Sequence, residues 1–286
     1  MTARTATAPA ATVPAPNERD AVVAAIQFLT RVPLPGPMDR PAEWFVAALR
    51  RGVRWFPVVG GLVGLVTAGL MVGGVAVGLD PLVAAAVALG LEAALTGAFH
   101  EDAFADTWDA LGGGWTREQT LTILTDSRLG TYGTLGLVVG LLVRAASMAT
   151  LAADPLWAVL AIVAAASLGR LAIVAMMATT PPVEGRDSAA KDVSGRQTPV
   201  VVAIAAVLSG PLWIGWGLAA PLVAAVTVAA AIAVAAWFRR KIVRRLGGTT
   251  GDLLGCTAYL VQLVVVVGST LAGSPLAGAP ITGGLP

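Results

Sequence analysis

Charged side chains are scarce in this sequence. Asp, Glu, Lys and Arg make up 13% of its 286 residues, whereas hydrophobic residues make up 56%. A soluble domain of ordinary composition carries roughly 25% charged residues. A water-soluble globule of this size could not bury so much apolar side chain, so lipid must cover the remainder. The composition therefore excludes an ordinary soluble protein and indicates an integral membrane protein.

Other absences narrow the class further. Cys256 is the only cysteine, which excludes an intramolecular disulfide. The sequence has no Walker A motif, no GxSxG elbow, no zinc-ligand cluster and no GxGxxG fingerprint. Nothing beyond a few basic loops favours a nucleic-acid partner, and we expect none. Residues 1–19 are rich in Ala, Thr and Pro and lack the apolar core of a signal peptide, so we expect a disordered tail there.

What is present is a series of apolar runs of about 20 residues, the length needed to cross a bilayer as a helix. The runs occupy residues 56–79, 81–99, 130–151, 156–178, 199–217, 221–238 and 252–271. The sequence thus predicts an all-α polytopic membrane bundle of about seven transmembrane helices. We expect residues 20–272 to form a single membrane-embedded domain and residues 273–286 a flexible tail.

The basic residues predict an orientation. With seven spans, every Lys and Arg between spans falls in connections on one side, whereas the turns near residues 80, 154 and 219 and the segment after 272 hold none. The positive-inside rule assigns the basic side, including the N-terminus, to the cytoplasm. We therefore expect a multi-pass protein of a bacterial cytoplasmic (inner) membrane, with its long polar segments on the cytoplasmic face. The oligomeric state is open, and a homo-oligomer is one option.

An acidic segment follows the second span. Four of the 17 acidic residues and the only histidine lie between His100 and Asp109. On a helix, Asp102, Asp106 and Asp109 share one face, where their charges repel one another unless a cation lies between them. Carboxylate oxygens suit Mg²⁺ or Mn²⁺, which bridge to substrate phosphates. The alternative is a solvated acidic helix, and His100 is as readily a structural residue as a catalytic one.

Further polar positions surround this segment, and each has a structural alternative. Gly112 and Gly113 permit a tight turn and close approach of a ligand, or form a flexible linker. Arg128, two residues after Asp126, has the planar shape that binds phosphate in a bidentate manner. Asp252 is either a first-turn acid or part of a ligand site in its glycine frame.

Three ionisable residues lie inside predicted spans, namely Glu92, Arg144 and Arg170. Such residues are expensive in lipid, so each is a functional candidate. A structural pair between Glu92 and one of the arginines is the alternative.

Taken in order, these motifs make the sequence resemble the cobalamin synthase family, the adenosylcobinamide-GDP ribazoletransferases. The matching segments are Phe28–Pro35, Phe56–Gly64, His100-Glu101-Asp102-x-x-Ala105-Asp106-x-x-Asp109 with Gly112–Gly114, Asp126–Gly133, Gly169-Arg170 and Gly251-Asp252-x-x-Gly255. They extend through most of the chain.

The resemblance implies a Mg²⁺-dependent transfer of the phosphocobinamide part of adenosylcobinamide-GDP to α-ribazole or its 5′-phosphate, with release of GMP. It implies a catalytic role for residues 20–272 and Mg²⁺ as the cofactor. The implied metal ligands are Glu101, Asp102, Asp106 and Asp109. The implied catalytic residues are His100, Asp106, Asp109, Asp126 and Arg128, and the implied substrate-binding residues are Gly112, Gly113, Arg170 and Asp252.

The sequence departs from the family pattern in two places. Tyr259 and Gln262 stand where acidic residues are usual, and residues 181–187 replace an Arg-rich segment. Two other classes of membrane protein are alternatives. A CDP-alcohol phosphatidyltransferase would carry Ala-Arg shortly after Asp106-x-x-Asp109 and a second spaced aspartate pair, which this sequence lacks. A small-molecule transporter would place its ionisable residues at mid-membrane within an inverted repeat, and no such repeat is evident.

Overall fold

The computed structural model describes residues 15–184, 197–273 and 275. Three predicted segments lie mostly or wholly outside the described residues. They are the N-terminal tail (1–19), the C-terminal tail (273–286) and the loop bearing Arg186, Lys191 and Arg196. Within the described tail, the structure differs from the prediction: helix α1 already begins at Glu18, because Asn17 and Asp20 form a reciprocal capping box.

The described chain is helical and contains no β-strand, which confirms the predicted all-α bundle. Its α-helices are α1 (Glu18–Leu29), α2 (Ala42–Gly52), α3 (Phe56–Ala76), α4 (Pro81–Thr96), α5 (Phe99–Gly113), α6 (Arg117–Ile123), α7 (Thr131–Leu151), α8 (Pro155–Thr179), α10 (Pro199–Ser209), α11 (Pro211–Ala219), α12 (Pro221–Leu246) and α13 (Gly251–Thr270). Two short 3₁₀ turns, η1 (Pro37–Asp39) and η2 (Val53–Trp55), flank α2.

Local sequence sets several helix starts. Asp80 and Asp154 each accept backbone N–H bonds at the start of the following helix, and a proline occupies the first helical position after each. Thr198 and Thr250 cap α10 and α13 in the same way. The predicted breaks at these prolines are therefore confirmed.

Five helical stretches in the described chain are long and apolar enough to span a membrane, and the number rises to seven if two bent pairs are each taken as one span. The chain bends by 93° between α4 and α5, and by 67° between α10 and α11. The predicted spans 81–99 and 199–217 are thus the two broken ones. The first ends at Thr96, and the second is interrupted at Gly210-Pro211, where proline cannot continue the hydrogen-bond ladder.

Helix α8 lies at the centre of the bundle and packs against α3, α10, α11 and α13. Glycines allow the closest of these approaches. A side chain at Gly60 or Gly64 of α3 would collide with α8 at Ala166. This small-residue packing leaves no room for polar groups except at selected positions.

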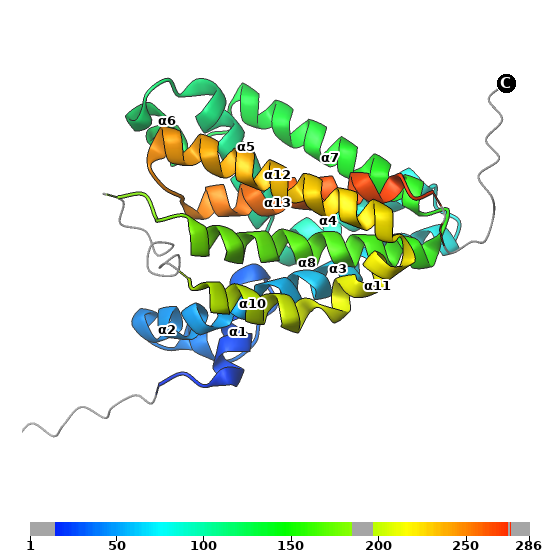
Figure 1. Cartoon of the computed structure of the whole chain (residues 1–286), viewed down its shortest axis with the longest axis horizontal. Helices are drawn as coiled ribbons and strands as arrows, with labels where there is room; N and C mark the ends of the chain where they lie inside the picture. The colour runs from blue at the N-terminus through cyan, green and yellow to red at the C-terminus, as the bar shows by residue number, and fades with distance from the viewer. Residues whose placement is uncertain (1–14, 185–196, 274, 276–286) are drawn as a thin grey trace, which may run out of the picture.

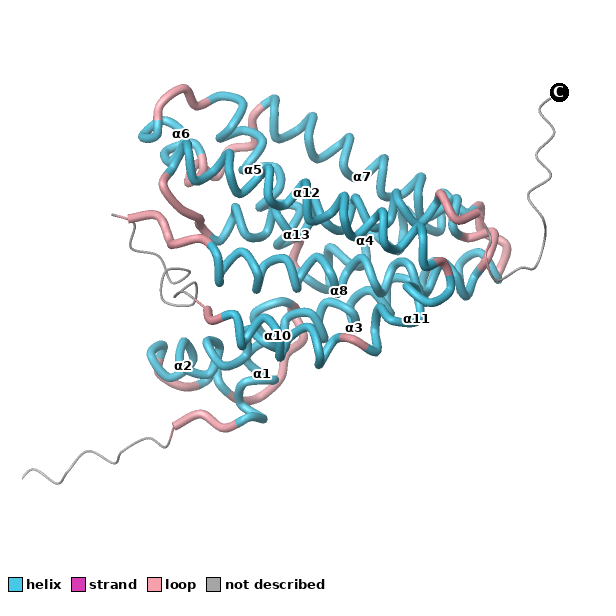
Figure 2. The backbone as a smooth tube through the Cα atoms, in the orientation of Figure 1, coloured by secondary structure: helices cyan, strands magenta, loops and turns pink. Residues whose placement is uncertain are grey.

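The connections gather at two ends of the bundle (Figure 2). The turns after α3, α7 and α11 lie at the end of the bundle where α13 finishes, whereas α6 and the starts of α7, α10 and α13 lie at the other (Figure 1). We call this second end, formed by residues 99–130, 180–184 and 246–251, the polar end. It carries the acidic segment.

A sharp turn sets the direction of α5. Gly97 and Ala98 both adopt left-handed backbone angles, with φ of 73° and 56°. Glycine accepts this conformation freely, but alanine is strained in it. The turn directs α5 away from the axis of α4 and onto α13, α7 and α6. We treat α5 as lying outside the membrane-spanning segments because of this bend and its four acidic side chains.

Candidate active site

One face of α5 carries acidic side chains toward the start of α13. Asp102 is exposed and Asp106 is half-buried, as is Asp252 in the first turn of α13. Partial burial, and the charges of Asp102, Asp252 and Asp109, raise the pKa of Asp106 to about 6. Asp252, predicted as a substrate-binding residue, therefore joins Asp102 and Asp106 in one cluster. We call these three residues the acid cluster.

Asp109 has a different environment from the acid cluster. The backbone N–H groups of Gly130 and Gly133 donate to its two carboxylate oxygens at 2.7 and 2.8 Å. These groups lie at the start of α7, where a carboxylate also interacts favourably with the helix dipole. A side chain at Gly130 or Gly133 would collide with the Asp109 carboxylate. The structure thus shows Asp109 anchoring α7 onto α5.

Glu101, predicted as a metal ligand, points into the bundle instead. It is 8% exposed, and Nη1 of Arg144 on α7 lies 3.3 Å from its Oε1. Nη2 of Arg144 also donates to both oxygens of Glu92 on α4, at 2.7 and 2.8 Å, and Thr67 of α3 donates to Glu92 at 2.7 Å. Glu92 and Arg144 therefore form a buried structural ion pair, the alternative to a functional role.

A second buried group adjoins this ion pair. Arg170 of α8 donates to Oε1 of Gln262 on α13 at 3.1 Å, and its Nη2 lies 3.5 Å from Nδ1 of His100. The Arg144 guanidinium lies 5.8 Å from the centre of the Tyr259 ring. Both residues that depart from the family pattern, Tyr259 and Gln262, thus contact buried arginines. Two arginines and two glutamates balance in charge without an acid at either position.

His100 of α5 and Arg170 of α8 are each 2% exposed and face each other inside the bundle, whereas Asp102 is exposed and Asp106 is half-buried. The structure does not bring them together with Asp102 and Asp106. The His100 ring packs edge-on against that of Phe99, with 5.4 Å between the ring centres, and its buried Nε2 has no hydrogen-bond partner among the described residues.

The glycines that follow the acidic segment differ from one another. Gly112 packs against the ring of Tyr132, so closely that a side chain there would collide with it. Gly113 is exposed, and the carbonyl of Gly114 accepts a hydrogen bond from Arg245. Close helix packing therefore explains Gly112, whereas Gly113 is exposed and a side chain there would make only ordinary contact with Ile123.

Asp126 and Arg128 lie in the loop that leads from α6 to α7. Their side chains form an ion pair at 2.6 Å, and Arg128 is 87% exposed. Hydrogen bonds from Arg128 lower the pKa of Asp126 to about 2. The pair stands two residues before Gly130, which Asp109 holds, so the anchor at Asp109 also locates this loop beside α5.

The acid cluster was tested for fit to Mg²⁺. Within the described residues, no three His, Cys, Asp or Glu side chains form a ready-made metal-binding group. Mg²⁺, however, commonly binds through one or two carboxylates and completes its shell with water and substrate phosphate. Asp102, Asp106 and Asp252 offer such oxygens, and partial burial together with the charges of its neighbours raises the pKa of Asp106 to about 6. This donor set fits an ion shared with a phosphate better than a closed cage that includes Glu101 and Asp109.

The fold and this site define a polytopic helical membrane protein with an open carboxylate cluster at one end of its bundle. Comparison with known sequences gives the family. A family model described as cobalamin-5-phosphate synthase matches residues 21–270, and the chain belongs to this family. The resemblance drawn from the motifs is confirmed.

Curated relatives match along nearly their whole length. An adenosylcobinamide-GDP ribazoletransferase of Rhizobium etli (strain CIAT 652) is 41% identical over 250 residues, which cover 85% of this chain and 93% of the relative. Proteins of the same name from Leptothrix cholodnii and Azorhizobium caulinodans are 39% and 37% identical, covering 85% and 86% of this chain and 92% and 94% of the relatives. No solved structure matches significantly.

Proposed function

We propose that this chain is an adenosylcobinamide-GDP ribazoletransferase that performs the nucleotide-loop assembly step of cobalamin biosynthesis. A hydroxyl oxygen of α-ribazole, or of its 5′-phosphate, forms a new bond to the phosphorus that carries cobinamide. The bond from that phosphorus to GMP breaks, the hydroxyl proton is lost, and GMP leaves. The products are adenosylcobalamin, or its 5′-phosphate, and GMP. The acid cluster at the polar end is the observation that carries the proposal, together with family membership.

Mg²⁺ is the proposed cofactor, held by Asp102 and Asp106 with Asp252 close by. When bound, it neutralises charge on the diphosphate and on the leaving nucleotide. The carboxylates would hold the ion at the start of α13, where Asp102 is exposed and Asp106 and Asp252 are half-buried, so that the diphosphate can approach from the open side. Asp109 keeps α5 and α7 in register, so that the loop bearing Arg128 lies beside the substrate.

Arg128 is proposed to bind phosphoryl oxygens, because its guanidinium is exposed and keeps donors available beyond Asp126. Asp126, with a pKa lowered to about 2, is a weak proton acceptor at neutral pH and is better suited to orienting Arg128. Of the two predicted substrate-binding glycines, Gly113 is the exposed one.

The membrane orientation is part of the proposal. Among the described residues, Arg117 and Arg128 lie in the segments that form the polar end, and Arg245 contacts the carbonyl of Gly114 there, together with the acid cluster. By the positive-inside rule this end and the N-terminus are cytoplasmic, in a bacterial inner membrane. Both substrates would then reach the site from the cytoplasm.

The deciding measurement is GMP release from adenosylcobinamide-GDP and α-ribazole by detergent-solubilised protein, with Mg²⁺ and with EDTA. We expect release with Mg²⁺ only, and a loss of at least about 100-fold in Asp106→Asn, the scale of removing one charge-stabilising group. Glu118→Gln is the matched control, because Glu118 is an exposed acid of α6 at the same end. Release of CMP from a CDP-activated lipid would instead favour a phosphatidyltransferase, and no nucleotide release from folded protein would refute the proposal.

A further inference from the structure

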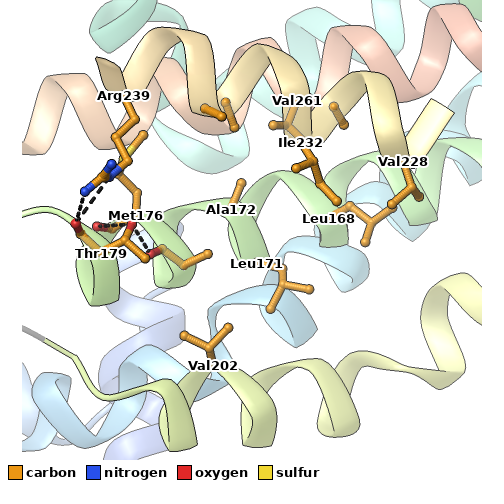
Figure 3. A pocket seen from close by; sticks show the side chains of 14 residues that line it. Leu168, Leu171, Ala172, Met176, Thr179, Val202, Val228, Ile232, Arg239 and Val261 are labelled. Carbon is orange, nitrogen blue, oxygen red and sulfur yellow. Dashed lines mark hydrogen bonds between the residues drawn. The ribbon is translucent and has the colours of Figure 1, made fainter. Parts of the chain in front are cut away.

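A groove on the side of the bundle is not used by the proposed reaction. It has a volume of about 390 Å³ and lies between α8, α10 and α12, with α13 at its base (Figure 3). Small side chains, Ala172 and Ala175 of α8, form much of its floor, and Val202 and Ile232 stand on opposite walls. Apart from Thr179 and Arg239, its lining residues are all apolar.

The bend between α10 and α11 accounts for the groove. Helix α11 packs against both α8 and α12, whereas α10 packs against α8, α3 and η2. Because the chain bends by 67° between the two helices, α10 diverges from α12 toward the polar end. The groove therefore results from the path of the backbone. It opens at Arg239, where the apolar part of α12 ends.

The open end of the groove carries positive charge. Arg239 is half-buried there, and its Nε donates to Oγ1 of Thr180 at 3.0 Å, while Nη2 donates to the carbonyl of Thr179. No carboxylate among residues 15–184 and 197–273 forms an ion pair with it. Arg240 and Lys241 follow directly and are exposed. The Arg239 guanidinium is held by one carbonyl and one hydroxyl at the end of an apolar groove, and it is therefore complementary to an anion with an apolar tail.

We propose that this groove binds one anionic glycerophospholipid, with an acyl chain against α8 and its headgroup phosphate on Arg239. From Val228 to Arg239 the groove follows about 16 Å of helix, at 1.5 Å per residue. This length is about half of the ~30 Å hydrocarbon core, so it accommodates a chain from one leaflet. A phosphatidylglycerol headgroup is anionic overall, whereas the choline cation of phosphatidylcholine offsets its phosphate charge, so the Arg239 guanidinium favours the anionic headgroup.

The test is native mass spectrometry of the full chain in detergent, titrated with dioleoylphosphatidylglycerol and, separately, dioleoylphosphatidylcholine. We expect the first phosphatidylglycerol to bind at least about fivefold more tightly than phosphatidylcholine, the preference that one basic residue near a lipid surface supplies. Arg239→Gln should remove this preference. Arg244→Gln makes the same charge change on an exposed part of α12 away from the groove and should keep it.

A second variant separates lipid binding from the contact of Arg239 with α8. Ala235→Leu fills the groove while leaving Arg239 in place, and it should weaken binding of the first phosphatidylglycerol at least about fivefold, the loss expected from displacing several buried methylene groups. Equal affinity for the two lipids in the unaltered protein, or an unchanged preference in Arg239→Gln, would mean that lipid is only annular and would overturn the proposal. Unchanged binding in Ala235→Leu would overturn the groove as the site. The test is independent of the proposed enzymatic activity.

Discussion

The buried ion pair between Glu92 and Arg144 gives the sharpest prediction about stability. Arg144 contacts two carboxylates, Glu92 through both oxygens and Glu101 at 3.3 Å, and both members of the pair are 2–3% exposed. Arg144→Met leaves two buried carboxylates without their cation, whereas Glu92→Gln leaves Arg144 still paired with Glu101. Removing one partner of a buried pair typically costs about 3–5 kcal/mol. We therefore expect Arg144→Met to reach or exceed that range and Glu92→Gln to lie at its lower end.

Glu101→Gln should cost the least of the three. Its contact with Arg144 is the longest, and its side chain is 11% exposed, so its charge is better solvated. The double variant Glu92→Gln with Arg144→Met should be more stable than the sum of the two single losses predicts, because it removes both charges together. The coupling should exceed about 2 kcal/mol, well above the ~0.5 kcal/mol within which independent sites add.

The assay is unfolding of the purified protein in mixed micelles by increasing SDS, followed by Trp fluorescence, for the unaltered chain and the four variants. The predicted order of destabilisation is Arg144→Met, then Glu92→Gln, then Glu101→Gln. Additive effects in the double variant, or a larger loss in Glu101→Gln than in Glu92→Gln, would refute the assignment of the ion pair as the element that joins α4 to α7.

Three further predictions concern α5 and its surroundings. Asp109→Asn should lower the unfolding free energy by about 1.5–3 kcal/mol, because it weakens the charge-assisted bonds from Gly130 and Gly133, and SDS unfolding measures this; an effect below 0.5 kcal/mol would contradict the anchoring role. Gly133→Ala should lower the unfolding free energy by about 1–3 kcal/mol through overpacking, and it should lower GMP release by displacing α7. Gly69 has open space around it, so Gly69→Ala serves as the tolerated control in both assays. Ala98→Gly should raise the thermal unfolding midpoint of the protein, since it relieves about 1 kcal/mol of left-handed strain; a fall in the midpoint would contradict the strain argument.

Much of the architecture follows from local sequence. Apolar runs of membrane-spanning length predict the helices, and Asp-Pro and Thr-Pro pairs predict where α4, α8 and α10 begin. These features are readable because each depends on hydrophobic transfer or on a backbone group within one turn. The bends were not predicted, since a 93° turn depends on two consecutive left-handed residues, one of them an ordinary alanine.

The partner of each acidic residue could not be predicted from the sequence. Helical periodicity correctly places Asp102, Asp106 and Asp109 on neighbouring positions of α5, but it says nothing about what stands opposite each one. In the structure, Asp252, 146 positions later in the sequence, lies close enough to raise the pKa of Asp106, and Asp109 accepts hydrogen bonds from the start of α7. Glu101, one position before Asp102, turns inward to Arg144.

Composition, run length and motifs are properties of the chain alone, and they identify a helical membrane protein, its apolar segments and its family. Only the tertiary structure decided which acids share a site and which are structural. A carboxylate in a low-dielectric surrounding must find a cation or backbone donors, and the packing of α5 against α7 and α13 determines which partner each one meets.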